Sequence, residues 1–273
     1  MTEQEVRSSE DLNPYLNAVG LGAWCYLPEI GSTNDAALEW AGRGAPDWSL
    51  VVADAQTTGR GRGKRRWVTE PGCALAMSLV LRPSPIEADF APRFTALAAL
   101  SLIEALAEWG LHAELKWPND ILLAGKKVAG VLVEADWQAD LVQSAVIGLG
   151  VNVSMGSIPP KETLRYPATA VEVVLGSPVD RWALLASALA AMKRYRNILT
   201  TPAFYEAWNR NLAQRGDWVS FRVADKKVHK MKVLGVQVDG QLVLEQADGT
   251  VISSATGEIL MAEDGCLKPI LLV

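Results

Sequence analysis

The stretch "AELKWPNDILLAGKKVAGVLVEA" (residues 113–135) decides the fold class, because two apolar, strand-like runs flank a short turn. The turn is Ala124-Gly125-Lys126, and a glycine-containing turn between two such runs is typical of a β-hairpin. The strands of a hairpin are antiparallel, whereas parallel neighbours need a longer crossover connection. The stretch therefore predicts antiparallel pairing in the main sheet.

Strand-like and helical segments alternate on both sides of this hairpin, from about residue 26 to about residue 214. Strands are predicted at residues 49–54, 73–81 and 141–153 from their apolar, β-branched composition. Helices are predicted at residues 32–44, 92–110, about 180–198 and about 202–214, and the last two are expected to cover the sheet. Hairpins outnumber strand–helix–strand crossovers, so the fold class is α/β, with a mixed, largely antiparallel sheet flanked by helices.

The pattern changes after Gly216, where short strands replace helices. These strands are "DWVSFRV", "KMKVLGVQV", "QLVLEQ" and "TVISSATGEILMA", with turns expected at Asp239-Gly240 and Asp248-Gly249. A unit of so few residues is only marginally stable alone. We therefore expect a small β-barrel that packs on the first domain. The predicted organisation is an N-terminal lead (1–25), a catalytic domain (26–214) and a β-barrel domain (215–273).

Composition limits the class of protein. The 273 residues carry a formal net charge of -5, which is the wrong sign for coating nucleic acid or an anionic membrane. The N-terminus has no pattern of a secretory signal, and the longest apolar run (183–192) is about half the ~20 residues that span a bilayer. Three separated cysteines give neither a disulfide framework nor a CxxC metal site. A cytoplasmic protein without a membrane partner is expected.

A basic loop, "TTGRGRGKRRWVTE" (57–70), stands out in this acidic chain. Basic residues beside an aromatic suit an arm that lies on nucleic acid, and glycines among arginines suit a loop that holds a small anion. A solvated surface turn is the third interpretation. The loop matches neither GxGxxG nor the P-loop pattern, because Lys64 stands at the third glycine position and Arg65 follows Gly63-Lys64.

Further cationic and amide groups lie at predicted strand ends. They are Lys116, Asn119, Asp120, Lys127 and Asn152. Joining a carboxylate to an ATP phosphate requires fixed positive charge beside both anions, and arginine and lysine supply it. The chain has only two histidines, which argues against a histidine-rich metal site and against a conventional Ser-His-Asp triad. The residues therefore favour carboxylate activation over nucleic-acid coating.

Five blocks in order carry a specific resemblance. They are "STND" (32–35), Gln56 with "GRGR" (59–62) and Trp67, "KWPND" (116–120), "KKVAGVLVE" (126–134) and "GLGVN" (148–152). Together they resemble the catalytic domain of biotin–protein ligases, which is related to class II synthetase and lipoate ligase catalytic domains. The segment "TGEI" (256–259) is similar to that family's C-terminal SH3-like barrel. The resemblance covers about residues 26–262.

The resemblance implies a reaction in two steps. Biotin and Mg·ATP give biotinyl-5′-adenylate, and a lysine of a biotin carboxyl carrier protein domain then displaces AMP. The implied catalytic residues are Lys127, Arg62 and Lys116, and Asp120 is the implied Mg²⁺ ligand. The implied biotin-binding residues are Ser32, Thr33, Asn34, Gln56, Arg60, Gly61, Arg62, Lys127, Gly130, Gly148 and Gly150. The implied ATP- and adenylate-binding residues are Arg62, Arg65, Trp67, Lys116, Asn119, Lys127 and Asn152.

The chain departs from the family pattern at one place. The family usually reads GRGRxGRxW, whereas Gly63 and Lys64 exchange the variable and glycine positions here. A lysine avoids the left-handed conformation that glycine accepts, so the loop is expected to close differently or one residue later. We also expect the loop to be mobile without ligand and ordered with adenylate.

Other interpretations remain open from sequence alone. A lipoate- or octanoate-protein ligase or transferase shares the broad fold, a nucleic-acid-binding module would use residues 57–70 as its arm, and a catalytically silent homologue would account for Lys64. Only 31 residues precede Ser32, too few for a winged helix-turn-helix, so no DNA binding is expected. Strand pairing across a sheet edge would allow a homodimer, although no segment demands one.

Overall fold

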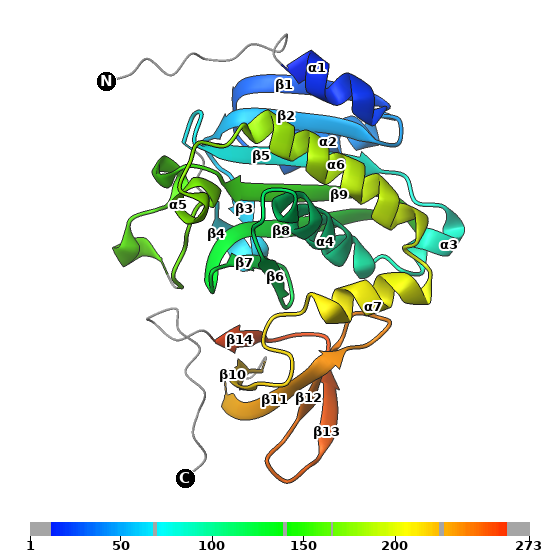
Figure 1. The fold of residues 1–273 in the computed structure, drawn as a ribbon. Coiled ribbons are helices and arrows are strands. Elements are labelled where there is room, and N and C mark those ends of the chain that lie inside the picture. The colour runs from blue at the N-terminus through cyan, green and yellow to red at the C-terminus, as the bar shows by residue number, and fades with distance from the viewer. Residues whose placement is uncertain (1–11, 68–69, 139–140, 165, 224–226, 261–273) are drawn as a thin grey trace.

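The computed structural model describes residues 12–67, 70–138, 141–164, 166–223 and 227–260. Within them, a seven-stranded sheet lies between helices, and a five-stranded sheet follows it toward the C-terminus (Figure 1). The seven strands, in spatial order, are β1 (Ala23–Ile30), β2 (Ser49–Gln56), β5 (Ala74–Leu81), β9 (Leu141–Asn152), β8 (Lys126–Gln138), β7 (Asp120–Leu123) and β6 (Ala113–Lys116).

Strand pairing confirms the predicted mixed, largely antiparallel sheet. The pair β1–β2 is parallel and is connected by helix α2 (Thr33–Gly42), whereas the other five pairs in this sheet are antiparallel. The hairpin of residues 113–135 forms as expected between β7 and β8, with left-handed backbone at Ala124 (φ 50°) and Gly125 (φ 71°). Two successive positive φ angles give the tight turn that matches strand twist.

Helices cover both faces of this sheet. Alternate residues of a strand point to opposite faces, and Val51 accordingly packs with Ala37 and Ala41 of α2, while Leu50 and Val52 join the larger core. That core is covered by α4 (Arg93–Ala107) and α6 (Arg181–Asn197), which lie in front of the sheet in Figure 1. Both helices were predicted, with ends displaced by a few residues.

The prediction for the last helix was wrong in two respects. Helix α7 (Pro202–Arg210) ends four residues early, and it packs against α4 and β11 instead of covering the sheet (Figure 1). The physical reason is a pairing with the sheet edge: the Leu115 amide donates to the Asn211 carbonyl (2.8 Å), and the Ala213 amide donates to the Leu115 carbonyl (2.9 Å). Backbone groups that form hydrogen bonds with β6 in this way are not available for the hydrogen bonds that would continue the helix.

The C-terminal sheet has five antiparallel strands. In spatial order they are β13 (Val251–Ser254), β12 (Leu242–Glu245), β11 (Val228–Val236), β10 (Trp218–Arg222) and β14 (Glu258–Leu260). Gly240 (φ 86°) and Gly249 (φ 84°) lie in the predicted turns. Residues 250–262 were expected as one strand; their described part, 250–260, forms β13 and β14 at opposite edges, and no described residues pair these edges to close a barrel. The indole of Trp117 donates to the Gly240 carbonyl (3.0 Å), so the sheet packs on the first one as expected.

The other described helices are short. They are α1 (Asn13–Leu16), α3 (Pro85–Ala88) and α5 (Val171–Leu175), with single 3₁₀ turns at Asn17–Val19, Met155–Ser157 and Lys161–Thr163. Across the described ranges, every helix is too short or too polar to cross a bilayer. Cys25 and Cys73 are free thiols, and Cys266 lies outside the described residues. The predicted domain boundaries at residues 25/26 and 214/215 stay predictions.

Candidate active site

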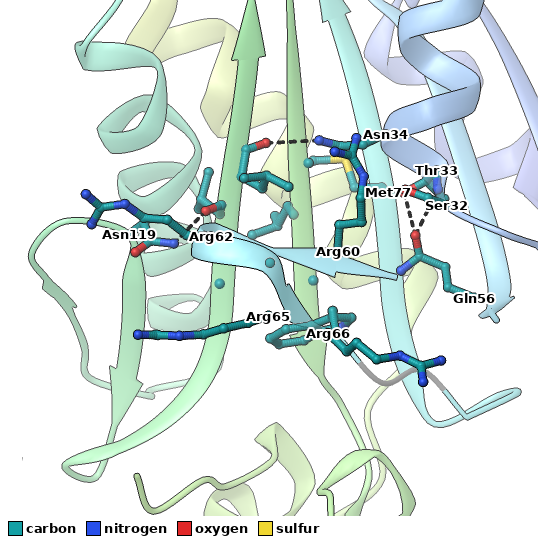
Figure 2. Close-up of a pocket in the computed structure, with 18 of the residues that line it drawn as sticks. Ser32, Thr33, Asn34, Gln56, Arg60, Arg62, Arg65, Arg66, Met77 and Asn119 are labelled. Carbon is teal, nitrogen blue, oxygen red and sulfur yellow. Dashed lines mark hydrogen bonds between the residues drawn. The ribbon is translucent and has the colours of Figure 1, made fainter. Parts of the chain in front are cut away.

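The basic loop forms a small hairpin that lies across the main sheet (Figure 2). Strands β3 (Arg60–Gly61) and β4 (Arg65–Arg66) pair, and a 3₁₀ turn at Arg62–Lys64 joins them. Gly63 takes the left-handed conformation in this turn (φ 69°, ψ 39°). The left-handed residue of this turn is therefore Gly63, one residue before the glycine position of the family pattern, and the expectation that the loop closes differently or one residue later stays a prediction.

The loop and the sheet enclose a pocket in which most of the predicted residues meet. All of the site residues expected from sequence line it except Lys116 and Asn152. The predicted residues that line it are Ser32, Thr33, Asn34, Gln56, Arg60, Gly61, Arg62, Arg65, Trp67, Asn119, Asp120, Lys127, Gly130, Gly148 and Gly150. Segments far apart in sequence thus converge on one site, while the ligand roles of these residues stay predictions.

The two exceptions lie nearby. Lys116 lines an adjoining groove together with Arg62, Arg65 and Asn119, and Arg222 of the C-terminal sheet faces the same groove. Asn152 is buried, and its Nδ2 donates to the Thr169 carbonyl at 3.1 Å. In this structure the Asn152 side chain therefore holds the segment after β9 and does not line the pocket.

One end of the pocket is built from hydroxyls and amides at the start of α2. Ser32 caps the helix, because its Oγ accepts from the Asp35 amide at 3.4 Å. The Thr33 amide donates to Gln56 Oε1 at 2.8 Å, and the Thr33 hydroxyl lies 3.1 Å from the same oxygen. Figure 2 shows Gln56 beside Thr33 and Ser32. The helix cap thus brings neutral donors and acceptors to the pocket.

Asn34 lies over a row of residues across three strands. Ser78 of β5, Gly148 of β9 and Leu132 of β8 are register partners. A Cβ at Gly148 would overlap the Oδ1 atom of Asn34, so the glycine makes room for this side chain. The Ser78 hydroxyl donates to Asn34 Oδ1 at 2.6 Å. Glycine at 148 is therefore required by a protein side chain that lines the pocket.

A second row, two residues further along the strands, carries Trp67. Gly150 of β9 pairs with Gly130 of β8, and strand geometry places them about 7 Å from the Gly148 row. The indole of Trp67 lies on both glycines, and a Cβ at Gly150 would overlap it. In this structure, protein side chains occupy the space above Gly148 and Gly150 that the resemblance assigned to the biotin rings.

Lys127 supplies positive charge beside this second row. Its Nζ lies 2.6 Å from Asp120 Oδ1 and 5.7 Å from the centre of the Trp67 ring. A Cβ at Gly130 would lie 3.4 Å from the Lys127 ammonium. Arg65 forms an ion pair with Glu258 of β14 at 3.1 Å. Cationic groups therefore gather at the Gly130 end of the pocket, whereas the Gly148 end carries amide and hydroxyl groups together with the ion pair of Arg60 and Glu134.

Lys116 is almost fully buried, with 2% of its surface exposed. Burial lowers the pKa of its ammonium below the ordinary value, although the charge of Asp120 opposes this. Its Nζ lies 5.1 Å from the centre of the Tyr166 ring, a cation–π distance. A buried ammonium at a strand end is costly to stability, which is typical of a functional group.

Replacing Lys116 with methionine should raise the free energy of unfolding by about 1 kcal/mol at pH 7, because an apolar side chain of similar size has no desolvation cost. The folded-state pKa of Lys116 lies below the unfolded one, so the unfolded chain binds more protons between the two values. Stability of the wild type therefore increases as pH rises through that window, and the advantage of the variant shrinks. Urea unfolding of both proteins at pH 7 and pH 10 measures this; a variant less stable at pH 7 would contradict it.

Sequence reasoning missed several residues that contact the site. Ser78, Asp35 and Glu134 bind predicted site residues, and Met77, Leu132 and Leu149 line the pocket. Glu134 ends the block "KKVAGVLVE", and Ser78 is the polar residue in the apolar run 73–81. A polar residue in an otherwise apolar strand was therefore the available signal.

The residues around Asp120, the predicted Mg²⁺ ligand, limit the kind of metal site that it can form. In the described part of the chain, no three His, Cys, Asp or Glu side chains gather closely enough to form a metal site by themselves. Mg²⁺ commonly binds one or two carboxylates together with substrate phosphates. A single buried carboxylate facing the pocket fits a Mg²⁺ ion that arrives with ATP, and does not fit a resident metal.

Comparisons with known proteins agree with this geometry. The model of the biotin/lipoate A/B protein ligase family matches residues 26–152. The biotin–[acetyl-CoA-carboxylase] ligase of Paracoccus denitrificans is 35% identical over 84% of this chain and 97% of its own. The bifunctional ligase/repressor BirA of Bacillus spizizenii is 37% identical over 82% of this chain and 70% of its own.

Solved structures give the same result. The biotin protein ligase of Aquifex aeolicus in complex with biotin and ATP has a TM-score of 0.73 and 27% identity, covering 87% of this chain and 97% of that one. Similarity extends through nearly the whole of two of these three relatives. The chain therefore belongs to the biotin protein ligases of the biotin/lipoate A/B protein ligase family.

Proposed function

We propose that this protein activates biotin as biotinyl-5′-adenylate and transfers the biotinyl group to a lysine of a biotin carboxyl carrier protein domain. One observation carries the proposal: the amide of Asn34, which lies over Gly148, and the ammonium of Lys127, which lies beside Gly130, face one pocket. Biotin has a polar ureido ring at one end and a carboxylate at the other. The pocket offers neutral hydrogen-bonding groups for the ring and positive charge for the carboxylate.

In the first step, a biotin carboxylate oxygen forms a bond to the α-phosphorus of ATP, and the bond between that phosphorus and the bridging oxygen breaks to release pyrophosphate. Both reactants are anions, so fixed positive charge must lower the barrier. Lys127 lies inside the pocket, and Arg62 and Arg65 line both the pocket and the adjoining groove. Lys127 and Arg65 would supply this charge by exchanging their present partners, Asp120 and Glu258, for the substrate anions. Mg²⁺ would enter with ATP, held by Asp120, and would neutralise phosphate charge.

In the second step, the lysine amine of the acceptor attacks the acyl carbon of the adenylate. A carbon–nitrogen bond forms, the carbon–oxygen bond to AMP breaks, and the amine loses a proton to solvent or to the departing phosphate. The loop of residues 57–67 lies across the pocket and would shield the mixed anhydride from water. The acceptor is inferred from relatives named biotin–[acetyl-CoA-carboxylase] ligases.

The transfer is tested by incubating the purified protein with biotin, Mg·ATP and a biotin carboxyl carrier domain, followed by intact-mass analysis. We expect one added biotinyl group on the acceptor, and none on an acceptor whose exposed lysine is replaced by arginine. Lipoate in place of biotin should give no product. Modification by lipoate or octanoate alone would instead favour the related lipoate ligase activity.

Three further predictions belong to this proposal. The use of ATP as a substrate supports a cytoplasmic location. A homodimer would form by pairing at an edge of the main sheet. Residues 211–213 cover the β6 edge, so β1 is the edge that would pair.

The expectation that the chain does not bind DNA also stays a prediction, and a salt-dependent gel-shift titration with operator and random DNA measures it.

A further inference from the structure

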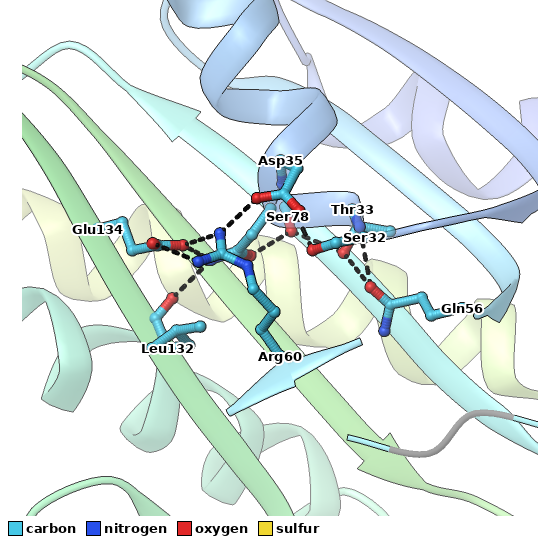
Figure 3. A network of polar contacts seen from close by, with 9 residues as sticks. Ser32, Thr33, Asp35, Gln56, Arg60, Ser78, Leu132 and Glu134 are labelled. Carbon is cyan, nitrogen blue, oxygen red and sulfur yellow. Dashed lines mark hydrogen bonds and ion pairs between the residues drawn. The ribbon is translucent and has the colours of Figure 1, made fainter. Parts of the chain in front are cut away.

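The guanidinium of Arg60 is held by two carboxylates that the predicted mechanism does not use (Figure 3). Its two terminal nitrogens donate to Glu134 Oε1 at 2.8 Å and to Glu134 Oε2 at 2.6 Å. One of them also lies 2.6 Å from Asp35 Oδ1. Glu134 belongs to β8, and Asp35 belongs to the first turn of α2. The basic loop is thus attached to the sheet and to the helix at the same point.

Glu134 has a second partner inside the pocket. Its Oε2 accepts from Asn34 Nδ2 at 2.8 Å, and the same nitrogen lies 3.3 Å from the Leu132 carbonyl. The other amide atom of Asn34 accepts from Ser78. An amide can be rotated so that oxygen and nitrogen exchange places, and a carboxylate, which only accepts, fixes which atom faces it. Glu134 therefore fixes the orientation of Asn34 together with the longer contact to the Leu132 carbonyl, which also only accepts.

We propose that Glu134 is a positioning residue, which couples closure of the basic loop to the orientation of the ligand-binding amide of Asn34. Because the carboxylate of Glu134 binds both Arg60 and Asn34, the positions of these two side chains depend on each other. The inference rests on the proposed function, because Asn34 is taken to contact biotin. It assigns Glu134 no contact with the reacting atoms.

Geometry and burial indicate which of the two carboxylates holds Arg60 more strongly. Glu134 contacts Arg60 with both oxygens, the fork arrangement in which arginine–carboxylate pairs are strongest. The Glu134 side chain is 28% exposed and that of Asp35 is 59% exposed, and exposed ion pairs contribute little. The hydrogen bond to Glu134 is also the largest cause that raises the pKa of Arg60. Glu134 should therefore matter more than Asp35.

The test compares Glu134→Gln with two matched controls in the full chain. Asp35→Asn removes the weaker contact to Arg60, and Glu39→Gln removes a carboxylate of α2 that binds Arg43 and does not touch the loop. Biotin affinity is measured by titration calorimetry without ATP. We expect an increase in Kd of about tenfold for Glu134→Gln, equal to the loss of about 1.4 kcal/mol, no more than about threefold for Asp35→Asn, and no change for Glu39→Gln.

Limited trypsin digestion gives a second readout that a general loss of stability would not reproduce. Cleavage after Arg62 and Arg65 should be faster in Glu134→Gln than in the wild type, while the melting temperature stays within about 2 °C because the pair is partly exposed. A double-mutant cycle with Arg60→Ala should be non-additive, since both changes break one contact. Additive effects, or wild-type affinity and loop protection in Glu134→Gln, would overturn the inference. Absence of biotin binding by the wild type would overturn the proposed function instead.

Discussion

Replacing Lys127 with methionine should reduce the rate of biotinyl-adenylate formation by about 10²–10³-fold, the usual effect of removing one preorganised group that stabilises transition-state charge. Lys127 faces the pocket beside Gly130, where the carboxylate and the α-phosphate would meet. Methionine retains much of the length of the lysine side chain and removes its charge. Single-turnover kinetics with biotin and ATP, followed by detection of the adenylate, measure the effect.

Lys126 provides the matched control for this change. It precedes Lys127 on β8, its side chain is exposed, and it does not line the pocket. Lys126→Met should therefore keep the wild-type rate within about twofold, because successive strand residues point to opposite faces. Loss of Lys127 leaves the carboxylate of Asp120 without its ion pair, so the urea unfolding of Lys127→Met is compared with that of the wild type to separate a folding defect from a catalytic one. Equal rates for Lys127→Met and Lys126→Met would refute the role of Lys127.

Gly148→Ala should weaken biotin binding by about 100-fold, equal to about 2.7 kcal/mol, which is within the range for overpacking a buried site. The added methyl group would overlap the Oδ1 atom of Asn34 and push that side chain away from Ser78 and Glu134. The backbone of Asn34 is held in the first turn of α2, so the side chain would have to take the displacement and give up these contacts. Titration calorimetry with biotin measures the loss of affinity.

Gly42→Ala is the corresponding control, because Gly42 belongs to α2 and no atom lies within 4 Å of an added Cβ. An alanine in a helix is more stable than a glycine by about 1 kcal/mol, so this variant should bind biotin normally and melt slightly higher. If Gly148→Ala binds biotin as tightly as Gly42→Ala, the row of Ser78, Gly148 and Leu132 does not define the ring end of the pocket.

Local sequence signals predicted much of the fold. The hairpin at Ala124 and Gly125 depends on residues adjacent in the chain, and so do the cap at Ser32 and the turns at Gly240 and Gly249. Strand β1 was not predicted, because "AWCYLPEI" contains a proline and no regular alternation, and its neighbour β2 is supplied from further along the chain. The end of α7 was misplaced for a related reason, since β6 competes for the backbone of residues 211–213.

In the candidate site, too, local motifs could be predicted from sequence, whereas contacts between distant segments could not. Residues in recognisable motifs were identified individually, and the structure brings them into one pocket. The partners of Asn34 could not be derived, because Ser78, Gly148 and Leu132 become neighbours only through the register of three strands. The exchange of Gly63 and Lys64 was visible in the sequence, and the structure places the left-handed residue of the turn at Gly63.

The central claim is that the pocket holds a carboxylic acid for adenylation and selects biotin. Exchange of labelled pyrophosphate into ATP by the purified protein, with biotin, lipoate and octanoate as parallel substrates, tests it most directly, because exchange requires a reversibly formed adenylate. We predict exchange with biotin, at most background exchange with the other two acids, and loss of exchange in Lys127→Met. A folded protein that supports no exchange with any acid, or exchanges with lipoate or octanoate and not with biotin, would contradict the claim.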